Sequence, residues 1–114
     1  MMVATGHTDG RVRIFNLNTG NKISDINSNQ PNQKTPVNSL RWRPVNEESN
    51  VMGSALLVAN TDGHLYQYVA KTGKEIFHTQ EEGNYIMAVD YTTQGLSFAT
   101  AGKDNIVRIL SLIH

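Results

Sequence analysis

Three aspartates are the first candidates in this chain for residues that do chemistry, because carboxylates act as general acids, general bases and metal ligands. Asp9, Asp62 and Asp104 each follow a short apolar run and precede a strand-like alternation of apolar and polar residues. They recur at equivalent positions of successive segments, 53 and then 42 residues apart. A repeated position is better explained by a turn than by a catalytic cluster, so we expect all three to be structural turn residues.

The four histidines are the other candidates for acid–base or metal chemistry. No two of His7, His64, His78 and His114 stand at the spacing of a local metal-ligand motif, and the first two flank Asp-Gly turns. The chain has no cysteine, which excludes a thiolate site and a disulfide. We therefore predict no metal and no cofactor.

Nucleophilic catalysis has no support in the sequence. There is no Gly-x-Ser-x-Gly elbow, no phosphate loop and no Gly-x-Gly-x-x-Gly segment. The serines Ser39, Ser54, Ser97 and Ser111 have no nearby His-Asp context of the kind that a catalytic triad needs. The sequence thus predicts a protein that is not an enzyme.

Charge and hydropathy exclude two further classes. Ten basic residues balance ten acidic ones and form no patch, so the phosphate attraction that dominates nucleic-acid binding is missing. The apolar runs are a few residues long, and residues 1–10 lack the apolar core of a signal peptide. We expect an intracellular, cytoplasmic protein that binds neither nucleic acid nor membrane.

The elements that carry these residues repeat along the chain. Residues 3–15, 56–68 and 98–110 align without a gap, each with an apolar run, an Asp turn and an alternating strand. Thr19-Gly20 and Thr72-Gly73 mark the next turns, again 53 residues apart. The pattern predicts successive antiparallel hairpins.

Each repeat extends to a unit of four strands. Val37–Trp42 and Ile86–Tyr91 open the second and third units, and residues 21–26 and 74–79 are expected to be the fourth strands of the first and second. Polar expansions around 27–35 and 45–53 account for the longer first spacing. Pro44 is expected to end the strand that holds Trp42.

These segments resemble the WD-repeat family. The resemblance is carried by Ala4-Thr5-Gly6, Asp9-Gly10 and Val12-Arg13-Ile14-Phe15-Asn16-Leu17, by residues 37–44, and by residues 98–100, 103–104 and 107–110. It implies an all-β fold, a partial β-propeller of four-stranded antiparallel blades with about ten strands. Residues 1–26 would be a blade lacking its first strand, 36–79 a complete blade, and 84–114 a blade lacking its last strand.

The chain departs from the family pattern in two places. The Trp-Asp pair of the family falls on Phe15-Asn16, Tyr68-Val69 and Leu110-Ser111, and the Gly-His pair is missing before Val37 and Ile86. In the family that His joins the turn Asp, a hydroxyl of the second strand and the Trp in a hydrogen-bond network. Here the His and Trp positions are lost, and the turn Asp is expected to bond its own turn.

The resemblance also implies where a partner would bind. Partners of the family often dock on the face formed by the turns between second and third strands and by the loops between blades. The residues before each turn Asp are Thr8, Thr61 and Lys103, and the early first-strand positions are Asn38 and Met87. Plain solvated surface is the alternative for each. Tyr85 lies in a loop before a first strand and is an exception among the otherwise packing aromatics.

The implied function is a non-catalytic scaffold that binds a protein or peptide partner, as a fragment of a larger propeller. The alternative is a structural or self-assembling piece with no independent binding function. It is motivated by the incomplete units, because open strand edges invite association. The sequence leaves both open.

Overall fold

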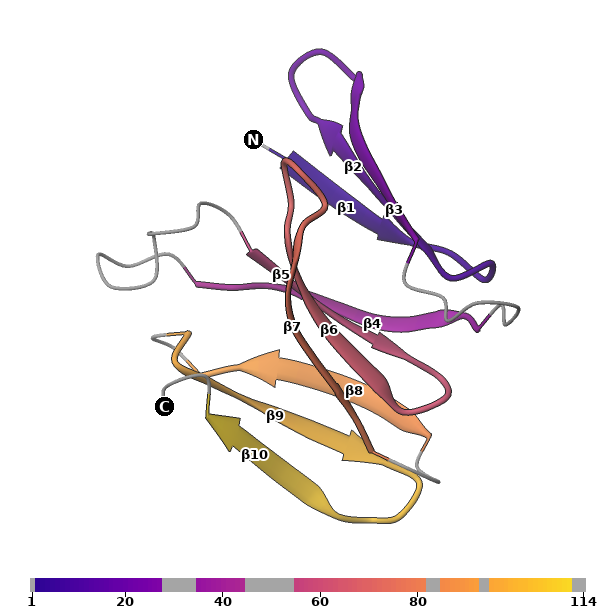
Figure 1. Ribbon diagram of the computed structural model, residues 1–114, viewed down its shortest axis with the longest axis vertical. Helices are drawn as coiled ribbons and strands as arrows, with labels where there is room; N and C mark the ends of the chain where they lie inside the picture. Colours follow the sequence, from indigo (N-terminus) through magenta and orange to yellow (C-terminus); the bar gives the residue numbers. More distant parts are fainter. Residues whose placement is uncertain (1, 28–34, 45–54, 82–84, 93–94, 112–114) are drawn as a thin grey trace.

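The computed structural model describes residues 2–27, 35–44, 55–81, 85–92 and 95–111, and its ten elements in these ranges are all strands. They form three antiparallel sheets (Figure 1). The first sheet contains β1 (Met2–Gly6), β2 (Arg11–Asn16) and β3 (Lys22–Asn27). The second contains β4 (Val37–Trp42), β5 (Ala55–Asn60), β6 (His64–Val69) and β7 (Glu75–Gln80). The third contains β8 (Ile86–Tyr91), β9 (Ser97–Gly102) and β10 (Val107–Ser111).

This arrangement confirms the predicted all-β, partial-propeller fold with ten strands in sheets of three, four and three. Parts of the sequence prediction lie outside the described residues. They are most of the two polar expansions, the ends of the third predicted unit, and His114. None of the described residues forms a helix that could cross a membrane.

The turns after the three aspartates have the backbone that the sequence demands. Gly10 and Gly63 adopt φ values of 84° and 92°, and Asn105 takes the same left-handed region at 63°. Glycine enters this region without steric cost, and asparagine tolerates it better than most residues. The chain therefore reverses directly into β2, β6 and β10.

The repeat extends to the irregularities of the sheets. The pairings of β2 with β3 and of β6 with β7 each shift register at equivalent positions, after Ile14 and after Gln67. The pairings of β4 with β5 and of β8 with β9 shift register just after their first pairs. Equivalent positions in different sheets can therefore be compared residue by residue.

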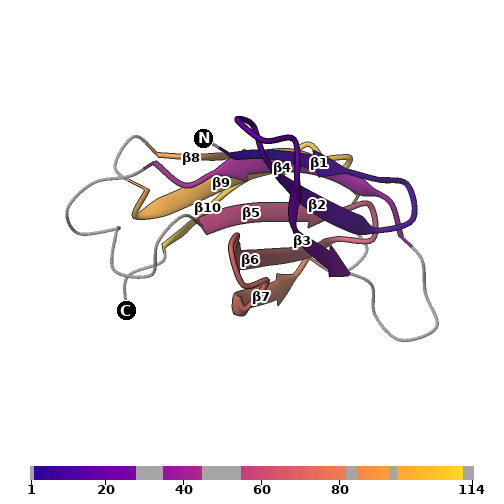
Figure 2. The same cartoon turned by 90° about the horizontal axis from the view of Figure 1, so that it is seen from above.

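The core is divided between two sheet-to-sheet interfaces. The first interface packs buried residues of β2 and β3 against β5, β6 and the residue that follows β6; its members are Val12, Ile14, Ile26, Leu56, Val58, Tyr66, Tyr68 and Ala70. The second packs β5 and β6 against β8 and β9; its buried members are Leu57, Ala59, Leu65, Ile86, Val89, Tyr91 and Phe98. Figure 2 shows β4 and β8 together along one edge of the molecule and β7 at the opposite edge.

Candidate partner-binding face

One side of the molecule gathers the β1–β2, β5–β6 and β9–β10 turns with the starts of β4 and β8 (Figure 1, right). Backbone hydrogen bonds tie these segments together. The Thr61 N–H donates to the Pro36 carbonyl, and the Lys103 N–H donates to the Tyr85 carbonyl, both at 3.1 Å. The N–H of Val37, at the start of β4, donates to the carbonyl of His7, which follows β1, at 3.1 Å. This bond joins the second sheet to the first. The turns are thus held against the strand starts, and we call this side the turn face.

The five binding residues predicted from the sequence lie in these segments, but they differ in how exposed they are and in whether the side chain is already hydrogen-bonded. Thr8 and Lys103 are exposed at the tips of their turns, and Met87 is 59% exposed on β8. Thr61 is half-buried. The Asn38 side-chain amide donates to the Ile86 carbonyl at 2.7 Å, so this side chain joins the second sheet to the third.

A groove of about 460 Å³ opens beside the strand starts. It brings Asn38 and Met87 together, while Thr8, Thr61 and Lys103 are not among its lining residues. The lining residues are Gly6, Val37, Asn38, Ser39, Leu40, Arg41, Met87 and Ala88.

Two exposed residues of this face carry features that the binding-residue prediction did not include. The Lys103 ammonium lies 4.9 Å from the centre of the Tyr85 ring, an arrangement that favours a cation–π interaction. Ile106 is 50% exposed directly after the third turn. The other two repeats have Arg11 and His64 at the position of Ile106. An apolar residue at this otherwise polar position was the signal in the sequence that could have identified Ile106.

Each turn aspartate is engaged by its own turn. Asp9, Asp62 and Asp104 accept hydrogen bonds from the backbone N–H two residues later, at 3.1, 3.2 and 3.1 Å. Such bonds are the Asx-turn geometry that stabilises a reversal of the chain. No group of three or more His, Asp or Glu side chains among the described residues is arranged to hold a metal ion.

The structure joins two histidines that sequence spacing left apart. His64 Nδ1 lies 2.8 Å from His78 Nε2, and the rings belong to the neighbouring strands β6 and β7. The His78 ring also stacks on Tyr66 at 4.5 Å between centroids. The pair extends the aromatic row of β6, and no local motif reveals it because the residues are 14 positions apart.

A charged network in the third sheet was also missed. The Thr100 hydroxyl donates to Glu81 Oε2 at 2.7 Å, and Arg108 donates to Glu81 Oε1 at 3.1 Å. Arg108 also pairs with Asp104 at 2.7 Å, and this bond, with the Ile106 N–H, holds the pKa of Asp104 below its usual value. Glu81 follows β7 directly and accepts a hydrogen bond from the hydroxyl of Thr100, on the second strand of its unit. In the family network the His contacts this hydroxyl, and that His is missing before Ile86.

Comparison with known proteins places these sheets in context. No family model matches the chain. The chain is 29% identical over 91 residues to eukaryotic translation initiation factor 3 subunit I of Rattus norvegicus, covering 75% of this chain and 26% of that protein. The Homo sapiens protein of the same name is 28% identical over the same coverage. The ribosome biogenesis protein ERB1 of Chaetomium globosum is 40% identical over 45 residues, which cover 40% of this chain and 5% of that protein.

These relatives are WD-repeat proteins. Together with the fold, they support the WD-repeat resemblance. The chain spans about a quarter of the length of the initiation factor subunits that it matches. WD-repeat proteins related to this chain are generally non-catalytic scaffolds, which agrees with a sequence that carries no catalytic motif.

Proposed function

We propose that this chain is a non-catalytic protein-interaction scaffold of the WD-repeat type, a segment of a larger propeller, and that its partner docks on the turn face. The observation that carries this proposal is the backbone bonding of the turns to the starts of β4 and β8. Binding residues on loops held by a rigid scaffold are ordered before the partner arrives, which lowers the entropic cost of binding. The predicted blades 1–26, 36–79 and 84–114 remain part of this proposal.

The relatives narrow the class of partner. One is named as a subunit of a translation initiation factor and another as a ribosome biogenesis protein. By analogy, the partner proposed for this chain is a protein or peptide component of an intracellular translation-related assembly, with a cytoplasmic location. No cofactor is needed for such a role.

The chemistry of the turn face suits a protein partner. Met87 and Ile106 offer exposed apolar surface, and Tyr85 presents a ring beside the Lys103 ammonium. Thr8 adds a hydroxyl at the first turn. Aromatic and apolar groups surrounded by polar ones are typical of interface hot spots.

The self-assembling piece remains a second candidate because a specific apolar surface favours it. On β10, Val107 and Ile109 are 68% and 74% exposed, whereas Val12 and Ile14 at the same repeat positions of β2 are fully buried. A further sheet would bury the β10 pair as the second sheet buries the β2 pair. Light scattering of the purified chain at several concentrations separates a discrete oligomer from a monomer.

The proposed docking face is tested with a triple variant, Thr8→Ala, Met87→Ala and Lys103→Ala. The matched control is Thr19→Ala, Leu17→Ala and Lys71→Ala, which removes the same kinds of side chain from the opposite ends of the strands. All six residues are exposed. Partners are cross-linked to the tagged chain in a translation-competent extract and quantified by mass spectrometry.

We expect the turn-face triple to lose the specific partner at least about tenfold, since interface hot spots commonly cost more than 1.4 kcal/mol each. The control triple should keep it. Equal binding by both variants would place the partner elsewhere. Absence of any partner that distinguishes the chain from an unrelated β-protein would favour the self-assembling piece.

A further inference from the structure

Two imidazole rings meet on the last two strands of the second sheet. His64 is the first residue of β6, and His78 lies on β7, which pairs with β6. Nδ1 of His64 and Nε2 of His78 are 2.8 Å apart, and the ring centroids are 5.0 Å apart. The rings therefore face each other through these two nitrogens.

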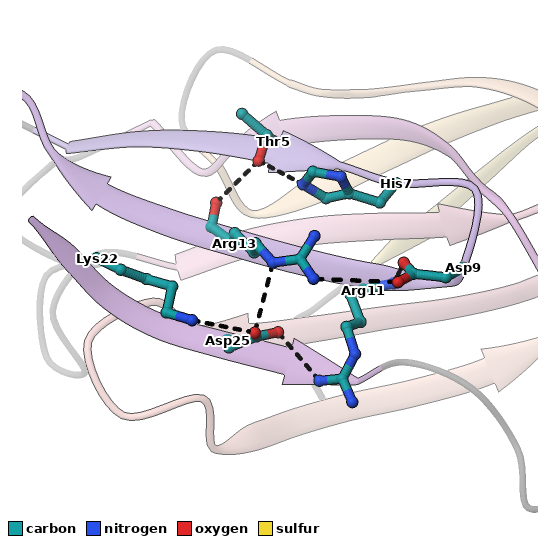
Figure 3. Close-up of polar contacts among 7 residues, drawn as sticks. All are labelled: Thr5, His7, Asp9, Arg11, Arg13, Lys22 and Asp25. Atoms are coloured by element: carbon teal, nitrogen blue, oxygen red, sulfur yellow. Dashed lines mark hydrogen bonds and ion pairs between the residues drawn. The ribbon is translucent and has the colours of Figure 1, made fainter. Parts of the chain in front are cut away.

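The first sheet shows what the repeat can place at the same two positions. Arg11 and Asp25 stand 53 residues before His64 and His78, and the two strand pairings shift register at equivalent positions. In the first sheet these side chains form an ion pair at 3.2 Å (Figure 3). The repeat thus brings the two positions together across the strands. In the second sheet it brings together two rings that do not attract each other as opposite charges.

Imidazole is the commonest metal ligand among side chains, and it binds through a nitrogen that carries no proton. Two nitrogens that bind one ion at about 2.1 Å, at right angles to each other, lie about 3 Å apart. The 2.8 Å between His64 and His78 is close to that separation. Their present contact needs a proton on one of the two nitrogens only, and a metal ion would replace that proton. Because His78 is exposed, its ring can turn toward the ion and water can complete the coordination.

Asp62 lies behind His64 as carboxylates do behind metal-bound histidines. Its Oδ2 is 3.8 Å from Nε2 of His64, while its Oδ1 accepts the backbone N–H of the same residue at 3.2 Å. The distance from Oδ2 is too long for a hydrogen bond, but the negative charge favours a proton on Nε2. Nδ1, which faces His78, then keeps its lone pair for an ion.

Stacking on Tyr66 limits how the two rings can move. The Tyr66 ring, which is 3% exposed, stacks on His78 with centroids 4.5 Å apart and planes inclined by 7°. It also stacks on His64 at 5.8 Å and 20°. Ligands that packing already holds near their binding positions lose little freedom when they bind.

From these observations we propose that His64 and His78 form a binding site for a divalent transition-metal ion, with Asp62 as a positioning residue for His64. The site has two protein ligands, so it is smaller than the groups of three or more excluded above. Two nitrogens at right angles suit the tetragonal geometry of Cu²⁺ better than the tetrahedral geometry of Zn²⁺, and Cu²⁺ also leads the general order of affinities. The site does not depend on partner docking at the turn face.

The experiment titrates the untagged 114-residue chain with Cu²⁺, Ni²⁺ or Zn²⁺ by isothermal titration calorimetry. The buffer does not bind metals and is held at about pH 7.5, where histidine is ordinarily neutral. His64→Gln and His78→Gln each remove one ligand. The matched control is His7→Gln, which makes the same change at a ring that contacts the Thr5 hydroxyl instead (Figure 3).

Two further variants separate the ligands from the fold. The double variant His64→Arg with His78→Asp installs the ion pair of the first sheet, so the strands keep a side-chain contact without either imidazole. Asp62→Asn keeps a side-chain oxygen for the turn and removes the negative charge behind His64. Thermal unfolding without metal confirms that each variant folds.

We expect one Cu²⁺ per wild-type chain, with weaker binding of Ni²⁺ and Zn²⁺. Asp62→Asn should weaken Cu²⁺ binding about tenfold, as loss of a partner behind a ligand commonly does, and either Gln variant at residue 64 or 78 should weaken it more. His7→Gln should leave the affinity unchanged. Saturating Cu²⁺ should raise the thermal midpoint of the wild type but not of the double variant, because an ion that binds only the folded chain stabilises it.

Four results would overturn the proposal. Equal affinity of the wild type and the double variant would place the ion elsewhere. Dependence on only one of His64 and His78 would exclude the paired site. Equal weakening by His7→Gln would mean an adventitious ion only, bound to scattered imidazoles. One ion per two chains, with a native mass that doubles on addition of Cu²⁺, would assign the ion to a contact between copies.

Discussion

The two interfaces between the sheets use equivalent positions with opposite chemistry. In the first, Ile14 faces the second sheet, and Val58 and Tyr66 face back; all three are buried. In the second, the equivalent positions hold Gln67, Thr100 and Arg108. Gln67 accepts a hydrogen bond from the Tyr91 hydroxyl, and the other two bind Glu81.

The difference shows that the repeat determines where the side chains of each interface lie. It does not determine whether those side chains are apolar or polar. At these positions the first interface is held by apolar area, whose contribution does not depend on the direction of the contact. The second also requires particular donors and acceptors to meet, because an unpaired buried polar group costs more than its bond contributes. No buried side-chain polar atom of the described residues lacks a partner.

The largest expected effect comes from Phe98→Ala in the second interface. Phe98 is fully buried and packs edge-to-face with Phe77 and Tyr91. Its loss should lower the free energy of unfolding by about 3–5 kcal/mol, measured by urea denaturation. Val3 stands at the same repeat position but is 40% exposed, so Val3→Ala should cost about 0.5 kcal/mol or less. Similar losses of unfolding free energy for both variants would mean that the contribution of this repeat position to stability does not depend on the interface around it.

Reciprocal exchange of Val58 and Thr100 sharpens the comparison. Val58→Thr places a hydroxyl in the apolar first interface and should destabilise the chain by about 1–3 kcal/mol. Thr100→Val removes the bond to Glu81, which keeps its bond from Arg108, and should cost about 1 kcal/mol. Thermal unfolding of both variants gives the order. A harmless Val58→Thr would contradict the apolar character of the first interface.

Removal of the Tyr91 hydroxyl tests the buried polar pair. Tyr91→Phe leaves the Gln67 amide, which is 3% exposed, without this donor, and should cost about 1–2 kcal/mol. Tyr68→Phe is the control in the first interface. The double variant Tyr91→Phe with Gln67→Leu should recover part of the loss, and additive losses would argue that the two side chains do not interact.

The smallest effect is expected from pH. Cationic partners lower the folded-state pKa values of Asp25 and Asp104, so both carboxylates stabilise the fold above their unfolded pKa of about 4. This contribution is lost as pH falls below 4 through the folded values. Denaturant midpoints between pH 7 and pH 2.5 should fall less for Asp25→Asn than for the wild type. If the midpoints of the wild type and of Asp25→Asn fall in parallel, these carboxylates do not cause the sensitivity of the fold to acid.

Much of the strand order could be predicted because it depends on local chemistry. Val37–Trp42 and Ile86–Tyr91 are strands with the predicted limits, and the strand holding Trp42 ends before Pro44. The strands expected at 21–26 and 74–79 begin and end one residue later. The shift accompanies the register irregularities of β2 with β3 and of β6 with β7, which the hydrophobic alternation does not encode.

The candidate site was less predictable. The turn tips Thr8, Thr61 and Lys103 follow from the repeat, because each precedes a turn Asp. The internal use of the Asn38 amide does not follow, because its acceptor is Ile86, 48 residues away. The aromatic contact of Lys103 with Tyr85 likewise required the turn and the strand start to be brought together.

The sequence by itself determined the turns, the alternation and the repeat. Turn chemistry and side-chain direction depend on neighbours a few residues apart, so Asp9-Gly10 or Val12-Arg13-Ile14 states its local structure directly. Only the tertiary structure decided which polar groups meet: Glu81 with Thr100, His64 with His78, and Tyr91 with Gln67. Each pair joins different elements across 14 to 24 residues, and its contact exists only once strands pair and sheets pack.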